Sequence, residues 1–208
     1  MNDSELLEWY QEKTAETAIY PKGEAGLAYV ALKLSGEIGE LWGALTDRAL
    51  NIEAAALEFG DVCWYISQLF TELNNYEEDE QLKVSLSSLL FDDKSIKETA
   101  KAHKQNYINM VSSTPYNIDF ICLINLSRAS LDANEIIGKF IRRGFFNPGD
   151  TNRVRALVDE VWGNVNVLAD YLNLDIKEIL SNNIEKLTTR KEAGELKDRD
   201  PKEAPPIS

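Results

Sequence analysis

Two pairs of acidic residues, each spaced three positions apart in an apolar run, constrain this chain more than any other feature of its sequence. Glu37 and Glu40 lie in LKLSGEIGELWGAL, and Glu58 and Asp61 lie in ALEFGDVCWYI. Residues three apart project from the same face of a helix, so the two carboxylates of each pair are expected to share a face. Each pair borders an apolar stripe rather than a generally charged surface.

The apolar residues around these acids recur at helical spacing over residues 24–47 and 52–74. The short polar link between the two runs favours an antiparallel hairpin of two helices. In such a hairpin all four carboxylates converge at the edge of the apolar contact, where partial burial strengthens their mutual repulsion. A bound cation would offset this repulsion, and ligands that are all oxygen suit a hard ion such as Mg²⁺ or Mn²⁺.

The alternative to a metal site is a solvated helix face, because acidic pairs are common in a chain with 35 Asp and Glu residues. The presence of two pairs on consecutive apolar helices favours the metal site. Gly36, Gly39 and Gly60 lie among the acids, although a glycine inside a helix costs about 1 kcal/mol relative to alanine. Their presence predicts that another group approaches the helices closely there.

Helical patterns also dominate the rest of the sequence, which predicts an all-α bundle made of two fused helical units. Further helical segments are expected over residues 3–16, 81–91, 95–112, 119–143 and 157–180. The predicted organisation is a first helical unit with the intact acidic set (1–75), an inserted helical segment (76–116), a second helical unit (117–190) and a loose, charged, proline-bearing tail (191–208).

The second helical unit resembles a duplicate of the first in which one acid is lost. Aligning SLDANEIIGKFIRRG with LSGEIGELWG places Asp132 and Glu135 opposite the first acidic pair. In the next helix Glu160 falls opposite the last acid of the second pair, and Leu157 replaces its first acid. A register with Asp159 as the ligand is an alternative, as is helical similarity without duplication.

The last predicted helix carries Asn183, Lys186 and Arg190, whose steps of three and four put them on one face. Lysine offers a point charge to a phosphate group, and arginine offers a planar pair of donors. The alternative is a basic helix end that is favoured by the helix dipole.

Three blocks of the sequence, in this order, resemble the all-α NTP pyrophosphohydrolases, the MazG-like and dimeric dUTPase group of phage and bacterial type. The blocks are TAIYPKGEAGLAYVALKLSGEIGE with its ExxE, EFGDVCWYISQL with its ExxD, and the terminal NNIEKLTTRKEAGELKDRD. The similarity covers about half of the chain. It implies the helical fold of that group and a homo-oligomer, either a dimer or a tetramer.

The resemblance implies hydrolysis of a nucleoside triphosphate between its α and β phosphates, giving a monophosphate and pyrophosphate. Two or three Mg²⁺ or Mn²⁺ ions would be held by Glu37, Glu40, Glu58 and Asp61. Glu37 or Glu40 would be catalytic, as the base that takes a proton from the attacking water.

The substrate-binding residues follow from the same resemblance. Lys186 and Arg190 would hold the β and γ phosphates, while Asn183 and Tyr65 would supply hydrogen bonds. Gln11 matches a glutamine that lies near the nucleotide in the resembling enzymes. For Tyr65 the alternative is a half-buried tyrosine without a role in binding.

The resemblance favours a purine deoxynucleotide such as dGTP as the substrate. Two alternatives remain, a dUTPase-like hydrolase of dUTP and dUDP and a helical interaction protein without enzymatic activity. A di-iron bundle needs two Glu-x-x-His motifs, and the chain has a single histidine, His103, with Ala100 three residues before it. The same shortage of histidine excludes a phosphohydrolase of the HD type.

The composition restricts the class of partner. A net charge of −13 argues against binding to a nucleic-acid backbone. No apolar run approaches the roughly 18 residues of a membrane helix, and the acidic, polar start of the chain is unlike a signal peptide. Cys63 and Cys122 show no metal or disulfide spacing. We therefore expect a cytoplasmic protein that binds no membrane.

Overall fold

The computed structural model describes residues 1–46, 51–77, 83–90, 95–111 and 118–196. The secondary structure of these residues is entirely helical, which confirms the predicted all-α class. None of the described helices combines the length and apolar character that crossing a membrane requires. The elements are α1 (Asp3–Glu16), α2 (Glu24–Thr46), α3 (Ile52–Asn74), the 3₁₀ helix η2 (Leu86–Leu89), α4 (Ile96–Val111), α5 (Ile118–Arg143), α6 (Asp150–Tyr171) and α7 (Ile176–Glu192).

The predicted helix over residues 81–91 is wrong for its described part, which contains only the single turn of η2. Serine side chains there bond locally, since the Ser88 hydroxyl donates to the Ser85 carbonyl at 2.7 Å and the Ser85 and Ser87 hydroxyls lie 2.5 Å apart. Such local bonds compete with a continuous helix. Helix α7 ends at Glu192, two residues into the predicted tail, and residues 197–208 of that tail lie outside the described part.

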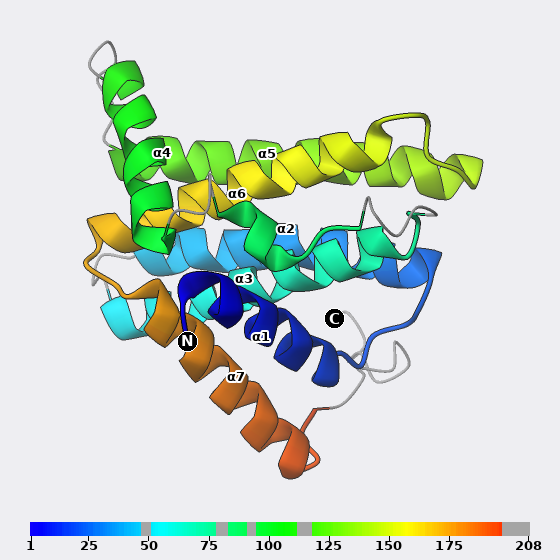
Figure 1. The fold of residues 1–208 in the computed structure, drawn as a ribbon, viewed down its shortest axis with the longest axis horizontal. Coiled ribbons are helices and arrows are strands. Elements are labelled where there is room, and N and C mark those ends of the chain that lie inside the picture. The colour runs from blue at the N-terminus through cyan, green and yellow to red at the C-terminus, as the bar shows by residue number, and fades with distance from the viewer. Residues whose placement is uncertain (47–50, 78–82, 91–94, 112–117, 197–208) are drawn as a thin grey trace, which may run out of the picture.

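Four long helices form the centre of the molecule, with α2 packed on α3, α5 packed on α6, and α2 lying against α5 (Figure 1). Helix α4 packs on α6, and α1 and α7 both pack on α3 (Figure 1). One continuous apolar core joins both halves of the sequence, from Leu34 and Leu69 to Leu126 and Trp162. Because the core is continuous, it does not separate the predicted helical units, and their boundaries stay predictions.

The α2–α5 contact brings matching positions of the proposed duplication together. The Ser35 and Ser130 hydroxyls lie 2.5 Å apart, and the alignment of the two acidic runs pairs these same two serines. Contacts between equivalent residues are the signature of a two-fold arrangement. This single contact fits the proposed duplication, which stays a prediction.

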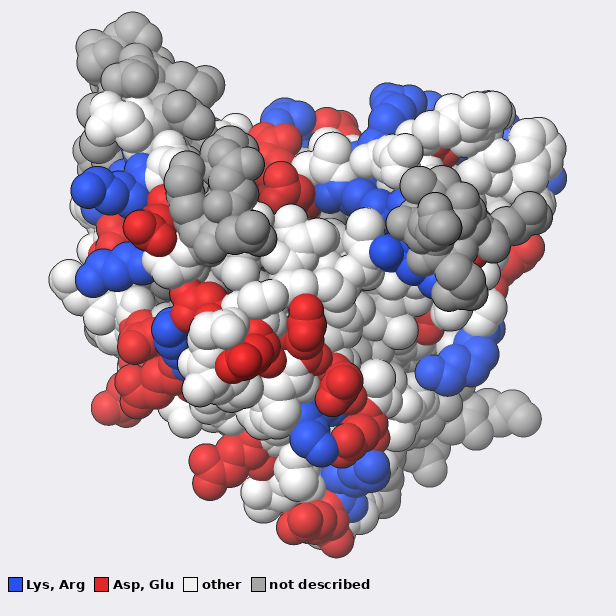
Figure 2. All heavy atoms as spheres, viewed as in Figure 1, with Lys and Arg blue, Asp and Glu red and all other residues white. Residues whose placement is uncertain are grey.

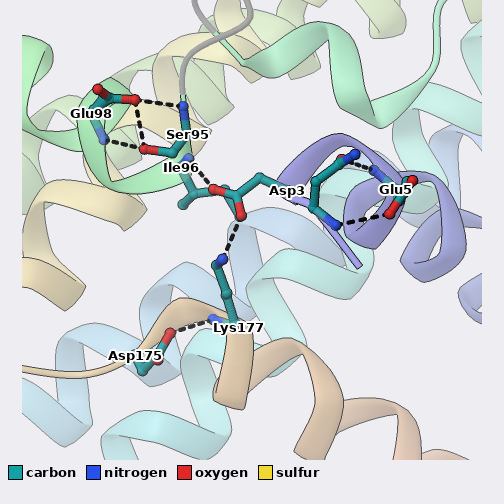
Figure 3. Close-up of polar contacts among 8 residues, drawn as sticks. Asp3, Glu5, Ser95, Ile96, Glu98, Asp175 and Lys177 are labelled. Atoms are coloured by element: carbon teal, nitrogen blue, oxygen red, sulfur yellow. Dashed lines mark hydrogen bonds and ion pairs between the residues drawn. The ribbon is translucent and has the colours of Figure 1, made fainter.

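Asp3 connects the N-terminal ends of three helices (Figure 3). Its carboxylate accepts a hydrogen bond from the Ile96 amide of α4 at 2.6 Å and pairs with the Lys177 ammonium of α7. Burial alone would raise the pKa of Asp3, but the bonds from Lys177 and Ile96 outweigh it and leave that pKa lowered.

Figure 2 shows acidic side chains interspersed with basic ones over one face of the described residues.

Glycine permits a close helix contact at only one of the three predicted positions. A Cβ atom at Gly60 would lie 3.0 Å from both Cβ and Nδ2 of Asn183, so this glycine lets α3 and α7 approach each other. At Gly36 and Gly39 a Cβ atom would meet nothing within 4 Å. No described part of the protein therefore makes the close approach predicted for these two, and for a bound group it stays a prediction.

We expect Gly60→Ala to lower the free energy of unfolding by about 1–3 kcal/mol, because an overpacked contact must shift either α7 or the Asn183 side chain. Gly43→Ala is the matched control, since Gly43 lies in α2 with open space around it. This control should be neutral or stabilising by up to about 1 kcal/mol. Denaturant unfolding of both variants measures the difference, and equal effects would show that the Gly60 contact is not tight.

We expect Asp3→Asn to lower the free energy of unfolding by about 1 kcal/mol at pH 7, since solvent partly screens the ion pair. A carboxyl whose folded-state pKa is lowered stabilises the fold above its ordinary pKa of about 4, and this contribution is lost as the pH falls through the folded-state value. The difference between the wild type and the variant should therefore shrink below about pH 4. Glu12→Gln, at an exposed position of the same helix, is the control.

Candidate functional site

Three of the four predicted metal ligands meet where α2 packs on α3. One carboxylate oxygen from each of Glu37, Glu40 and Glu58 lies within 4.8 Å of the other two. Two oxygens on opposite sides of a Mg²⁺ or Ca²⁺ ion are separated by about 4–5 Å. Glu37 is buried, with 7% of its surface exposed, whereas Glu40 is exposed and Glu58 is half-buried. We call these residues the glutamate trio.

Within the described residues, the positive charge near the glutamate trio does not balance its negative charge. Burial is the largest cause that raises the pKa of Glu37, and the charges of Glu40 and Asp61 add to it. Lys33 opposes this rise through an ion pair with Glu37 at 3.2 Å, but the pKa stays above its ordinary value. The pKa of Glu58 is raised by burial and then by Asp61, Glu40 and Glu37. An arrangement with oxygen ligands and excess negative charge fits a hard divalent cation.

Asp61, the fourth predicted ligand, lies beside the trio and is held by α7. Its Oδ1 accepts hydrogen bonds from the Lys186 ammonium at 2.5 Å and from the Asn183 amide at 2.9 Å. Two residues predicted to bind substrate are thus brought to the site, as their shared helix face predicted. The structure places both of them directly on an acid of the predicted metal site.

A cavity of about 380 Å³ opens beside the acids. Aromatic side chains form much of its wall: Tyr20 and Tyr29 are stacked with ring centroids 5.6 Å apart, and Trp64 meets Tyr65 edge-on at 4.8 Å. The cavity is lined by Thr17, Ile19, Tyr20, Tyr29, Lys33, Glu37, Glu40, Asp61, Trp64, Tyr65, Leu187, Arg190 and Leu196. Acids, two cations and aromatic rings therefore share one hollow.

A buried polar network fixes the aromatic wall. The Trp64 indole donates to the Thr17 hydroxyl at 3.0 Å, and the Tyr20 hydroxyl donates to the Gln68 amide oxygen at 2.9 Å. Gln68 in turn donates to the Thr14 hydroxyl at 2.8 Å. These bonds hold the segment after α1 against α3, so the rings of Trp64 and Tyr20 have defined positions.

The reasoning from sequence missed several residues that line this cavity. Tyr29 and Lys33 precede Glu37 by two turns and one turn of α2, so their spacing of four could have revealed a shared face. Trp64 is largely buried, and it also lines the cavity. Tyr20 lies in a turn, where periodicity carries no signal.

The other predicted binding residues have different surroundings. Tyr65 and Arg190 both line the cavity, as a role in binding requires. Gln11 does not: its amide nitrogen donates to the Thr71 hydroxyl at 3.3 Å, and its oxygen accepts from the Leu86 amide at 2.7 Å. Gln11 therefore ties α1 to α3 and η2, away from the glutamate trio.

The acids of the second set are paired with basic side chains of α5. Arg128 bonds Asp132 at 3.0 Å and also pairs with Glu160, so it bridges α5 and α6. Glu135 pairs with Lys139 at 2.5 Å. In the alignment of the two acidic runs, Arg128 takes the position of Lys33. The Arg128 guanidinium thus connects α5 with α6. The equivalent region of the α2–α3 pair carries excess negative charge instead.

The fold and the site define an all-α protein with a cluster of glutamates beside an aromatic cavity. No family model matches the chain, and no solved structure matches it. The Gene 37 protein of Mycobacterium phage L5 is 36% identical over 81 residues, a match that covers 31% of this chain and 69% of the phage protein. The chain belongs to the same family as that phage protein.

We expect Glu37→Gln to raise the melting temperature at pH 7 when divalent cations are removed. A carboxyl whose folded-state pKa is raised destabilises the fold progressively as the pH rises from its ordinary value of about 4.3 through the raised value. The gain should therefore vanish below about pH 4, where the wild-type carboxyl is protonated in both states.

If the trio binds a cation, Mn²⁺ should raise the melting temperature of the wild type, because binding to the folded state stabilises it, and the same variant should lose that rise. Asp132→Asn is the matched control at the equivalent position of the second acidic set and should keep that rise. Thermal melts with and without Mn²⁺ measure both effects. A Mn²⁺ response that Glu37→Gln leaves intact would remove Glu37 from the metal site.

Proposed function

We propose that this protein is a metal-dependent nucleoside triphosphate pyrophosphohydrolase that cleaves a (d)NTP to the monophosphate and pyrophosphate. The observation that carries the proposal is the glutamate trio at the edge of a cavity that also holds aromatic rings, Lys33 and Arg190. A nucleotide needs partners for its base and for its phosphates, and both kinds are present. The resemblance to the MazG-like enzymes supports the same activity.

Each residue of the site has a place in this reaction. Two or three Mg²⁺ or Mn²⁺ ions, when bound, would offset the phosphate charge and make a water molecule more acidic. Glu37, Glu40, Glu58 and Asp61 would hold these ions. Glu37 or Glu40 would take the proton of the attacking water.

The phosphates would be bound by the basic side of the cavity. Arg190 would hold the terminal phosphates with its planar donors. Lys186 bonds Asp61 and lies close enough to the trio to act on the pKa of Glu58, so its ammonium would be shared between Asp61 and a phosphate oxygen. Asn183 and Tyr65 would supply hydrogen bonds. The base would stack on the aromatic wall. Every base has a π face, so such stacking does not by itself select one base.

The proposed substrate is a purine deoxynucleotide such as dGTP. A dUTPase-like activity is the second candidate. The contact between the matching residues Ser35 and Ser130 favours this activity, because the contact fits a duplicated unit.

The reaction would take place in the cytoplasm. The protein would act as a dimer or tetramer, and the exposed Leu32 of α2 and Leu131 of α5 offer apolar surface for such contacts. Light scattering tests the oligomer, and a monomer would contradict it.

We expect Asp61→Asn to reduce turnover by at least about 100-fold, as removal of one charged group aimed at the transition state commonly does. The matched control is Glu160→Gln at the equivalent position of the second acidic set, where Arg128 holds the carboxylate. The control should retain wild-type turnover. Loss of folding in Asp61→Asn, measured by thermal melting, would instead give Asp61 a structural role.

The reaction itself is tested by incubating the protein with each NTP and dNTP and Mg²⁺ or Mn²⁺, then separating the products. Monophosphate and pyrophosphate are expected, and the preferred base identifies the substrate. Diphosphate and orthophosphate would show that the cut lies at the other bond. No turnover together with no Mn²⁺ binding by calorimetry would favour a helical interaction protein.

A further inference from the structure

A buried chain of hydrogen bonds runs from α1 through α7 to Asp61 of α3. The Tyr10 hydroxyl donates to Oδ1 of Asn183 at 3.0 Å, and Nδ2 of Asn183 donates to Oδ1 of Asp61 at 2.9 Å. Tyr10 is fully buried, and only 3% of the Asn183 surface is exposed. Nothing in the proposed mechanism uses Tyr10, although its hydroxyl is two hydrogen bonds away from a proposed metal ligand.

The surroundings of Asn183 allow only one orientation of its amide. With the amide rotated by half a turn, its oxygen would face the negatively charged Asp61 oxygen across 2.9 Å, and two acceptors repel. In the observed orientation both ends of the amide are satisfied, which matters because a buried polar atom without a partner is costly. The Tyr10 hydroxyl is the donor that satisfies the oxygen.

The packing of α7 on α3 leaves this amide little room to move. A Cβ atom at Gly60 would lie 3.0 Å from both Cβ and Nδ2 of Asn183, so a larger residue at this position of α3 would not permit the observed packing. The Tyr10 hydroxyl also lies 3.4 Å from the Gly60 carbonyl. The three helices therefore meet at one point, directly next to Asp61.

We infer that Tyr10 is a positioning residue that, through Asn183, fixes the Asp61 carboxylate with Oδ1 toward α7 and leaves Oδ2 as the oxygen that Asp61 offers to a cation. The inference rests on the proposed function in one respect, the role of Asp61 as a ligand. Residues that orient ligands in this way typically change metal affinity by 10–100-fold when they are replaced. Tyr10 itself would touch neither the metal nor the substrate.

The test compares Tyr10→Phe with Tyr76→Phe in the full-length chain. Tyr76 is a suitable control because its hydroxyl is buried and makes no hydrogen bond within the described residues. The first readout needs no metal: hydrogen exchange of the Asn183 side-chain amide by ¹⁵N NMR, with its signals assigned by their loss in Asn183→Leu. The second readout is the Mn²⁺ dissociation constant from calorimetry.

Tyr10→Phe is expected to speed exchange of the Asn183 amide and to weaken Mn²⁺ binding, each by about tenfold. Tyr76→Phe should change neither. Adding Tyr10→Phe to Asn183→Leu should cause no further loss of Mn²⁺ affinity, because the link to Asp61 is already absent. An equal loss in both backgrounds would show that Tyr10 acts through general stability, and would overturn the inference.

Unchanged exchange in a folded Tyr10→Phe protein would also overturn it. If this variant does not fold, the wild type supplies the decisive measurement, a slowly exchanging Tyr10 hydroxyl proton close to Asn183; rapid exchange of that proton would contradict the hydrogen bond. If the wild type binds no Mn²⁺, the proposed function fails, whereas the exchange measurements still decide whether Tyr10 orients Asn183.

Discussion

The repulsion among carboxylates at the edge of the α2–α3 contact is the interaction on which the rest of the structure depends. Packing two apolar stripes together leaves Glu37 largely buried and brings Glu40 and Glu58 toward it. Burial and mutual charge raise the pKa of both Glu37 and Glu58. Such an arrangement costs stability, and this cost is the physical reason to regard the trio as functional.

The two halves of the chain deal with their acids in opposite ways. In the second half Arg128 bridges Asp132 and Glu160, so positive charge is built into the helix pair. In the first half Lys33 neutralises only part of the charge on Glu37, and Lys186 of α7 is attached to Asp61. The difference is the reason that the metal site is proposed at the α2–α3 pair.

Helix α7 and the segment after α1 complete the site, and neither belongs to the helix hairpin. Gly60 allows α7 to approach α3 closely, which delivers Asn183 and Lys186 to Asp61. A left-handed turn at Gly194 then directs the chain back so that Leu196 also lines the cavity. Hydrogen bonds between α3 and the segment after α1 hold the rings of Tyr20 and Trp64, which line the same cavity.

The sequence by itself determined the helices, because an apolar repeat of three and four residues has one stable form in water, a helix with its stripe buried. It therefore predicted the bounds of α2 and α3 to within a residue and the shared face of each acidic pair. The tertiary structure alone decided which distant residues meet: Tyr10 with Asn183, Gln11 with the Leu86 amide, and Arg128 with Glu160. Periodicity describes one helix at a time, whereas these contacts depend on how helices far apart in the sequence cross and on the small volume of Gly60 at one crossing.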